Sequence, residues 1–518
     1  MREKKKREFR GFLDFHSLFS HSFLYSALTL SVTRQQRLDA IHTALEAFST
    51  HKHTQLHNYE VDCGAANALC LKLGYIQNND WNEIDLILAT LLCVYKGCTQ
   101  DRLLRSFHDI GHSELMPLLT QTLYRLTSAL VESVLLRVVL LLRLFAKLDV
   151  TKTSLIQTNG LIENLIKLLQ QTKESTEIQG EMLGFIKDLT FRSSSRDREI
   201  LFHTPMLVPT LVQLTTTTTT TTSYKSDYNY VANIWWNFAL LPLLTRTMMQ
   251  SEGILESLQS LLTSETSKVR RSALSALGNL ASQQNATTHL IPRFREVLQS
   301  IVVKDNDKDC QRRAMRTIRC LVNAFRQQEG FLDFLCKVIV ADTSDIDTMM
   351  HAVECMTCLT SQPESKTQLI AILIFAVEVA TVPRMTTAAC RTILSIPDRP
   401  QLSDRISCEF LVSLEKAVKE TKEYDCHDIV SKILLILSTE DNEKLLSTPV
   451  LNILAMLALS TGTIIQVIQN IAEKDANRRP MAEHDALLSS LVTFAMETND
   501  GPEKDNAKNL ILKLVTEL

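Results

Sequence analysis

The stretch Ser251–Gln283 constrains the fold more than any other part of the chain, because it combines two apolar patterns of helical period. In the first pattern apolar side chains recur three or four residues apart, which places them on one helix face; they are Leu255, Leu258, Leu261 and Leu262. After a polar break at Thr263–Lys268 comes a second set, formed by Val269, Ala273, Leu274, Ala276, Leu277 and Leu280. Two short amphipathic helices cannot bury their apolar faces alone. The segment therefore predicts one unit of a stack of similar units.

Related segments lie on both sides of this unit. Its opening, in which Gly253 is expected to precede the first helix, recurs at Gly160 and at Gly330, each followed by a similar apolar run. Its end recurs as well, with successive asparagines 42 and 44 residues apart at Asn237, Asn279 and Asn323. These intervals fall within the roughly 40–47 residues of helical repeat arrays.

The combined pattern, G-x-x-x-x-L-x-x-L-L followed by A-L-x-N-L-A, resembles the armadillo repeat. The resemblance implies an all-α fold, a right-handed α-solenoid of stacked armadillo-like helical repeats, and we expect roughly ten of them. The match is specific over residues 151–365. Apolar periodicity alone extends it to divergent repeats at 34–150 and at 366–518. Divergence is expected there because one face of a terminal repeat meets solvent.

The composition agrees with a helical chain and excludes some partners. Thirteen Gly and twelve Pro are few for 518 residues, as helix interiors require. A net charge of −3 gives no general attraction to nucleic acid or to an anionic membrane. The twelve Cys are scattered, several at apolar helical positions, as expected for buried reduced thiols. We therefore expect a cytoplasmic or nuclear protein, or one found in both, that does not bind nucleic acid.

Two apolar segments raise the question of membrane contact. Residues 1–33 form a leader that begins with the basic run Met1–Arg10 and continues rich in Phe, Ser and Leu; it is either disordered or a targeting segment. Residues 126–148 are long enough to span a bilayer, but four charged side chains would be costly in lipid. We expect a buried repeat helix there and no stable membrane insertion.

A run of eight threonines, Thr215–Thr222, interrupts the repeat pattern. Threonine is a poor helix former, and the run has no apolar period. It follows a segment in which Met206 takes the position held by glycine in other repeats. The run predicts a loop insertion, which a solenoid tolerates because longer loops add little entropic cost.

The resemblance also implies where a partner binds. In armadillo proteins the third helix of each repeat lines a groove, and its asparagine grips the backbone of an extended peptide. The matching positions here are Asn237, Asn279 and Asn323. An amide suits this role because it offers both a donor and an acceptor to a peptide bond. The alternative is that each asparagine makes local hydrogen bonds near its helix end.

One element of the related importin α groove is missing. Importin α proteins carry tryptophan four residues before that asparagine, whereas this chain has Asn233, Ser275 and Arg319. Trp235 is instead expected in the core, and Trp236 at a partly exposed position. A basic nuclear-localisation cargo of the usual kind is therefore not expected.

A basic stripe is the most specific local feature. Its members are spaced 4, 3, 4 and 3 residues apart, so they share one face of a helix expected to end near Asn323; they are Arg312, Arg316, Arg319, Asn323 and Arg326. Four guanidinium groups on one face favour an acidic or phosphorylated partner. The alternative is a solvated face with ordinary intramolecular ion pairs.

The equivalent stripes of earlier repeats predict a gradient of charge. The stripe that ends at Asp188 contains Glu177 and Glu181, whereas those around Asn237 and Asn279 are largely uncharged. In this register the groove would run from acidic through neutral to basic. It would suit an extended partner whose charge reverses along its length.

No pattern typical of catalysis appears. The chain lacks a phosphate-binding glycine loop and a nucleophilic serine in a glycine elbow, and its CxxC, Cys355–Cys358, falls in a predicted helix. We therefore expect no enzyme, cofactor or bound metal. The sequence favours a scaffold or adaptor that binds an extended or helical protein segment. The alternative is a nucleocytoplasmic transport adaptor with a tryptophan-less groove, and the oligomeric state stays open.

Overall fold

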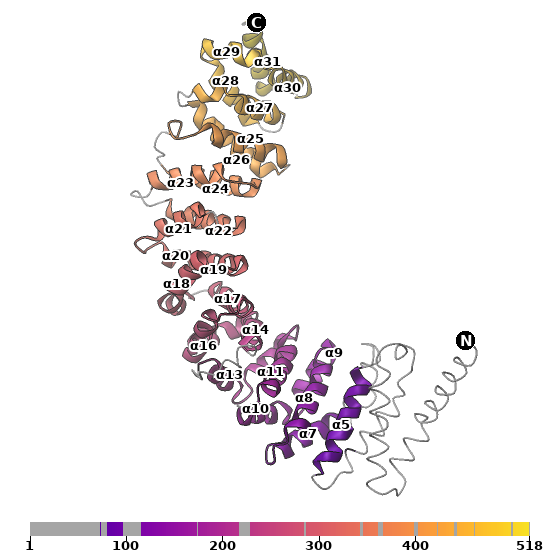
Figure 1. Ribbon diagram of the computed structural model, residues 1–518. Helices are drawn as coiled ribbons and strands as arrows, with labels where there is room; N and C mark the ends of the chain where they lie inside the picture. Colours follow the sequence, from indigo (N-terminus) through magenta and orange to yellow (C-terminus); the bar gives the residue numbers. More distant parts are fainter. Residues whose placement is uncertain are drawn as a thin grey trace, which may run out of the picture. The chain divides into compact units, whose positions relative to one another are not determined.

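The computed structural model describes residues 73, 80–96, 115–172, 175–216, 228–283, 286–341, 345–360, 366–397, 402–421, 423–439, 443–459, 462–498 and 501–516. Within these ranges the chain forms helices joined by turns, with no strand (Figure 1). The leader at 1–33, the first expected helices up to residue 72 and most of the threonine run lie outside them. The chain divides into two compact units, of which the first ends at Leu280 and the second begins at Ala281.

The first unit is a stack of three-helix repeats. Its helices are α5 (Trp81–Lys96), α7 (Met116–Leu126), α8 (Glu132–Ala146), α9 (Asp149–Gln157), α10 (Leu161–Gln171), α11 (Thr176–Thr190), α12 (Ser195–Phe202), α13 (Leu207–Thr216), α14 (Tyr228–Ala239), α15 (Pro242–Gln250), α16 (Glu252–Leu262) and α17 (Ser267–Ala281). Third helices pack on third helices along the series α5, α8, α11 and α14. Second helices do the same along α7, α10, α13 and α16.

The second unit continues with repeats in which the first helix is shortened, fused or missing. Its α-helices are α18 (Ala286–Lys304), α19 (Lys308–Cys320), α20 (Val322–Phe325), α21 (Phe331–Val340), α22 (Ile346–Met356), α23 (Lys366–Glu378), α24 (Pro383–Ser395), α25 (Cys408–Glu420), α26 (Tyr424–Thr439), α27 (Thr448–Leu457), α28 (Gly462–Ala472), α29 (Asp475–Ala482), α30 (Asp485–Glu497) and α31 (Pro502–Val515). The 3₁₀ helices are η4 (Thr357–Leu359) and η6 (Glu443–Leu446). The helices α19, α22, α24, α26, α28 and α31 pack in series, as third helices do.

The predicted all-α fold of stacked helical repeats is confirmed. The apolar sets of the Ser251–Gln283 unit are buried on α16 and α17, as their spacing indicated. The apolar stretch at 126–148 holds the repeat helix α8, which packs between α5 and α11. Among the described residues, no helix has the length and apolarity needed to cross a bilayer.

The residue before the second helix has the same left-handed backbone conformation in three repeats. Gly160 and Gly330 take left-handed conformations with φ of 75° and 76°, which glycine adopts without steric cost. Met206 takes the same conformation with φ of 65°, so it occupies the glycine position, as its alignment indicated. Gly253 differs from the prediction, because it lies inside α16 rather than before it. A Cβ there would meet Val212 Cγ1 at 3.1 Å, so close packing on α13 explains the small residue.

The threonine run begins differently from the predicted loop. Thr215 and Thr216 form the last residues of α13, and the rest of the run lies outside the described residues. Thr215 is buried, and its hydroxyl donates to Ser257 Oγ at 2.7 Å. Ser257 also accepts from Trp235 Nε1 at 2.9 Å, and Trp235 is fully buried, as expected. A polar contact between α13 and α16 therefore explains why two threonines extend the helix.

Candidate partner-binding surface

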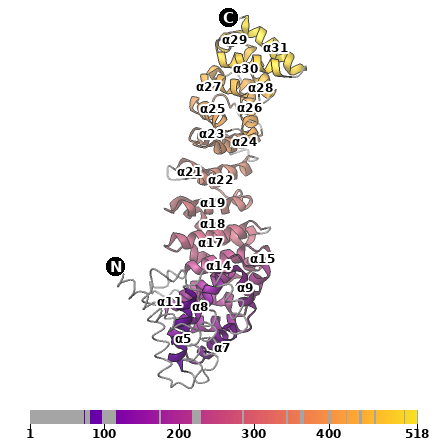
Figure 2. The same ribbon diagram turned by 90° about the vertical axis from the view of Figure 1, so that its right-hand side faces the viewer.

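The third helices form one side of each unit, and they carry most of the predicted binding residues. In the second unit the helices α19, α22, α24 and α26 lie side by side, with α21, α23 and α25 on the opposite side (Figures 1 and 2). Helix α19 begins after Asp307, whose carboxylate accepts from Cys310 N at 3.0 Å. This N-cap and the buried face of α19 point the arginine stripe away from the core.

Two arginines of the stripe are bound to carboxylates of the next third helix. Arg312 donates to Asp347 Oδ2 at 2.9 Å and also pairs with Asp309. Arg319 pairs with Glu354. Both acids lie 35 residues beyond their arginines, on α22. The intramolecular ion pairs that the sequence left as an alternative are thus present for Arg312 and Arg319.

These ion pairs shift the pKa of both arginines and of Glu354. Hydrogen bonding to Asp347 raises the pKa of Arg312. Partial burial lowers the pKa of Arg319, but its hydrogen bond to Glu354 and the negative charge of that group together outweigh burial, and the net pKa is raised. Burial alone would raise the pKa of Glu354, yet hydrogen bonds from Arg319 and His351 hold it below its ordinary value. His351 Nδ1 lies 3.1 Å from Glu354 Oε2. The charged forms are therefore mutually stabilised.

The remaining members of the stripe are exposed. Arg316 lies between the two ion pairs and makes no ion pair with any described residue. The helix does not reach Asn323 as predicted: α19 ends at Cys320, and α20 begins at Val322 after a non-helical Leu321. Asn323 and Arg326 are exposed, but they belong to this second short segment. Only the three arginines of α19 therefore lie on one continuous helix.

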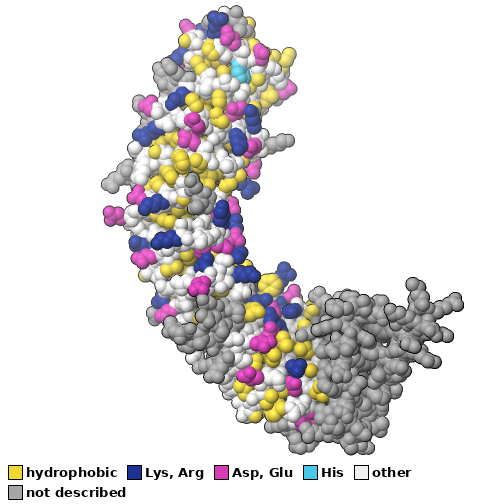
Figure 3. All heavy atoms as spheres, viewed as in Figure 1, with side chains coloured by type: hydrophobic (Ala, Val, Ile, Leu, Met, Phe, Trp, Pro, Cys, Tyr) yellow, Lys and Arg dark blue, Asp and Glu magenta, His cyan; other side chains and the backbone are white. Residues whose placement is uncertain are grey.

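From α19 onward the charges of the third helices alternate in sign. Helix α19 is basic, and α22 opposes it with Asp347 and Glu354. Helix α24 is basic again, and its Arg391 lies 3.9 Å from Asp425 of α26. Blue and magenta side chains are accordingly interleaved on this side of the second unit (Figure 3). Charge changes sign from helix to helix because neighbouring third helices neutralise each other.

The asparagines of the first unit do not share one environment. Asn237 is buried, and its Nδ2 donates to Thr190 Oγ1 of α11 at 2.9 Å, so its amide is bound to the preceding third helix rather than to its own helix end. Asn233 is half-buried; it donates to Asn229 O at 2.6 Å and accepts from Ser272 Oγ of α17 at 3.4 Å. Ser275 and Asn279 are half-buried on α17, and the Ser275 hydroxyl donates to Arg271 O at 2.7 Å.

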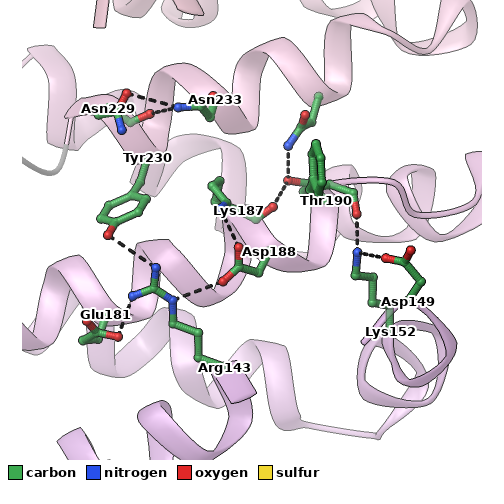
Figure 4. A network of polar contacts seen from close by, with 12 residues as sticks. Arg143, Asp149, Lys152, Glu181, Lys187, Asp188, Thr190, Asn229, Tyr230 and Asn233 are labelled. Atoms are coloured by element: carbon green, nitrogen blue, oxygen red, sulfur yellow. Dashed lines mark hydrogen bonds and ion pairs between the residues drawn. The ribbon is translucent and has the colours of Figure 1, made fainter. Parts of the chain in front are cut away.

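A buried ionic cluster on α8, α11 and α14 was not predicted (Figure 4). Arg143 of α8 donates to Glu181 Oε2 at 2.6 Å and to Asp188 Oδ2 at 3.1 Å, both on α11. Its guanidinium lies 5.4 Å from the ring centroid of Tyr230 on α14. Burial lowers the pKa of Arg143, but the hydrogen bonds outweigh this and raise it overall. The acidic end of the predicted gradient is therefore neutralised by a neighbouring helix.

Gly184 makes this cluster possible. A Cβ at Gly184 would lie 2.6 Å from Arg143 Cζ, so only glycine leaves room for the guanidinium over α11. The sequence signal was the spacing of opposite charges by about one repeat, from Arg143 to Glu181 and from Arg319 to Glu354. That signal is weak without knowledge of which helix faces are adjacent.

Comparisons with known proteins place the fold. No protein-family model matches the chain, and no curated protein matches it. Among solved structures, one from a study of a phosphorylation switch in the cadherin–β-catenin interaction superposes with a TM-score of 0.54 and 14% identity, over 95% of this chain and 98% of that one. This chain has an armadillo-like repeat fold. An engineered protein matches with a TM-score of 0.47 and 17% identity over 96% and 98% of the two chains.

Part of the chain is also similar to a designed protein. A designed armadillo repeat protein in complex with the peptide (KR)4 is similar over 49% of this chain and 99% of its own, with 18% identity and a TM-score of 0.41. At these identities the likeness concerns the fold.

Proposed function

We propose that this chain is a non-catalytic scaffold that binds an extended or helical segment of a partner protein along its third-helix surfaces. Acidic or phosphorylated groups of that segment would bind at α19. The observation that carries the proposal is Arg316, an exposed guanidinium with no carboxylate partner among the described residues, set between two half-exposed ion pairs. The solved structure with a TM-score above 0.5 comes from work on a protein–protein interaction, which supports the same class of function.

The two neighbouring ion pairs would assist binding. Arg312 and Arg319 are each more than a third exposed, so their pairs contribute on the order of 1 kcal/mol or less. An incoming phosphate or carboxylate at Arg316 could therefore recruit either arginine by exchanging with Asp347 or Glu354. Arg316 would supply the long-range attraction, and the exchange would add bidentate hydrogen bonds. The cytoplasmic or nuclear location is part of this proposal.

The test compares Arg316→Glu with Lys337→Glu in quantitative pull-downs from native cell extract. Lys337 is an exposed residue of α21, on the second-helix side of the same unit, so it controls for charge reversal alone. Partners that bind through α19 should be depleted about tenfold by Arg316→Glu and retained by Lys337→Glu. Far-ultraviolet circular dichroism would confirm that both variants stay helical. Equal recovery with both variants would remove α19 from the binding surface.

A further inference from the structure

The first unit has a second surface, formed where third helices end and first helices begin. We call it the junction edge and define it by residues 147–153, 191–200 and 240–246, which join α8 to α9, α11 to α12 and α14 to α15. Figure 2 shows α9 and α15 on the same side of the unit. This surface is distinct from α19, which belongs to the other unit.

Hydrogen bonds hold successive junctions next to each other. Lys152 of α9 is buried, pairs with Asp149 at 2.6 Å and donates to Phe191 O at the end of α11. Arg198 of α12 donates to Asn237 O near the end of α14 at 3.0 Å. Each cation thus caps the C-terminal end of a third helix 39 residues further on, where the helix dipole favours positive charge.

A third contact joins the first helices directly. Thr153 Oγ1 of α9 donates to Asp197 Oδ2 of α12 at 2.8 Å, and Asp197 is buried. The junction edge is therefore an ordered surface, and the side chains that project from it keep fixed relative positions.

The junction edge exposes bulky apolar side chains at corresponding positions of successive repeats. Phe191 and Leu240 directly follow α11 and α14, and they are 48% and 52% exposed. Val150 and Leu243 are the second residues of α9 and α15, and they are 62% and 71% exposed. These side chains recur at corresponding positions of the repeats, so they offer regularly spaced apolar contacts to a partner.

Cations without carboxylate partners lie on the same segments as these apolar groups. Four exposed basic residues of the edge make no ion pair with any residue that the structure describes; they are Lys147, Arg192, Arg196 and Arg246. Lys147 takes the place of Phe191 and Leu240 in its repeat, and Arg196 takes that of Val150 and Leu243. The edge also carries two exposed carboxylates, Asp149, which pairs with Lys152, and Glu199.

Arg192 is held in a strained conformation beside Phe191. Its φ of 54° is left-handed, which costs a non-glycine residue roughly 1–2 kcal/mol. Its guanidinium lies 5.2 Å from the ring centroid of Phe191. A cation and an aromatic ring are thereby presented together, and strained residues of this kind are concentrated at functional sites.

We propose that the junction edge binds an acidic segment of a partner protein that carries bulky apolar side chains between its carboxylates. Charge complementarity supports an acidic ligand, because the exposed cations outnumber the carboxylates and lack partners. The recurring apolar side chains of the edge support apolar side chains between the acidic ones. Successive repeats lie about 10 Å apart, so an extended segment at about 3.3 Å per residue would present one apolar anchor for about every three residues.

Uniformly charged ligands fit the edge less well. A lipid surface or a nucleic-acid backbone presents dense negative charge, which the exposed carboxylates of Asp149 and Glu199 would oppose. An acidic protein segment can leave these two positions uncharged. The ligand proposed for the junction edge differs from that of α19 because it needs apolar anchors. Each proposal can therefore be tested and contradicted independently of the other.

The test selects ligands from a phage library of random short peptides on the full-length chain, with Arg192→Glu/Arg196→Glu as the counter-selection target. The enriched consensus should combine Asp or Glu with Leu, Ile, Phe or Trp. A synthetic consensus peptide should then bind the wild type in fluorescence anisotropy, and the double variant should raise its Kd about tenfold or more. Leu243→Ser should weaken binding without changing its dependence on salt.

Controls separate this surface from others. Lys167→Glu reverses an exposed charge on α10 of the same unit and should leave the Kd unchanged, as should Arg316→Glu on α19. Circular dichroism would confirm that each variant is folded. Amide hydrogen exchange with bound peptide should show protection at 147–153, 191–200 and 240–246.

Three results would overturn the proposal. One is a library that yields no acidic and apolar consensus. Another is a consensus peptide whose affinity falls with Arg316→Glu but not with Arg192→Glu/Arg196→Glu. The third is tighter binding to vesicles of equal parts phosphatidylcholine and phosphatidylserine, or to single-stranded DNA, than to the peptide.

Discussion

The ionic cluster around Arg143 and the ion pairs between α19 and α22 share one arrangement but differ in their exposure to water. In both, an arginine on one third helix binds a carboxylate on the next. In the first unit the side chains of Arg143 and Asp188 are only 17% and 10% exposed. In the second unit those of Arg319 and Glu354 are 38% and 36% exposed. The first cluster is therefore less exposed to water than the second.

The physical reason for the difference is the cost of leaving a charge without its partner. Removing one partner of a buried ion pair costs about 3–5 kcal/mol, because the other charge stays out of water. An exposed pair contributes about 0.2–1 kcal/mol, because water solvates whichever group is left. Similar contacts between helices can therefore stabilise a repeat stack in one unit and serve as a binding surface in the other.

The largest expected effect is from Arg143→Met. It should destabilise the first unit by about 2–3 kcal/mol, less than for a fully buried pair, because Glu181 and Asp188 lose their shared cation while Lys187 still pairs with Asp188. Native-state hydrogen exchange of α8 and α11 would measure the loss locally. Arg137→Met is the matched control on the same helix. Arg137 pairs with Asp85 at 2.7 Å, but its side chain is 35% exposed. The substitution should therefore lower the free energy of unfolding by about 1 kcal/mol or less. Equal costs for the two variants would contradict the distinction.

A smaller effect is expected from Gly184→Ala. The new Cβ would displace the guanidinium of Arg143, and we expect a loss of about 1 kcal/mol, at the low end for overpacked sites because the displaced group ends a flexible side chain. In an Arg143→Met background the same substitution should cost much less, because the displaced group is absent. Native-state hydrogen exchange of the α11 amides, measured in the two single variants and in the double variant, gives the coupling energy between the two substitutions. Additive losses would mean that Gly184 serves the helix backbone and not Arg143.

The two units can also be compared through their backbones. Gly330→Ala in the second unit should cost roughly 1–2 kcal/mol, because φ is 76° and no atom lies within 4 Å of the added Cβ. Met206→Gly in the first unit should stabilise by about 1 kcal/mol, since φ is 65° and the Met206 side chain is exposed. Amide hydrogen exchange of α21 and of α13 would measure the stability changes caused by Gly330→Ala and Met206→Gly. A destabilising Met206→Gly would show that the methionine side chain outweighs its backbone strain.

The smallest effect concerns Arg319 and Glu354. A double-mutant cycle with Arg319→Gln and Glu354→Gln should give a coupling of about 1 kcal/mol or less that declines with added salt. Because the folded-state pKa of Glu354 is lowered, its contribution is present above the ordinary carboxyl pKa of about 4.3 and is lost as pH falls through the folded value. Amide hydrogen exchange of α22, measured across that range of pH, would follow the loss of this contribution. Salt-independent coupling would place this pair with the buried cluster.

Residue periodicity was sufficient to predict the repeats, because it reports which face of each helix is buried. Leu258 and Leu277 are fully buried, and Trp235 lies in the core as its alignment required. Local geometry was less predictable. Gly253 shares the sequence context of Gly160 but not its left-handed backbone, since close packing against Val212 and a left-handed turn both select glycine.

The binding residues could be predicted only in part. The arginines of α19 share a surface as their spacing indicated, but Asp347 and Glu354 reach them from a helix 35 residues away. The basic and apolar junction edge had no sequence signal, because its members come from three separate loops and helix starts.

The sequence by itself determined the helices, their buried faces and the repeat period, since these follow from the spacing of apolar residues along one chain. Only the tertiary structure decided which charges are neutralised and which stay available. Stacking sets which third helices are adjacent, so it placed Arg143 against Asp188 and left Arg316 without a carboxylate among the described residues. The effect of a charge depends on its neighbours and on its exposure to water, and neither is encoded in the local order of residues.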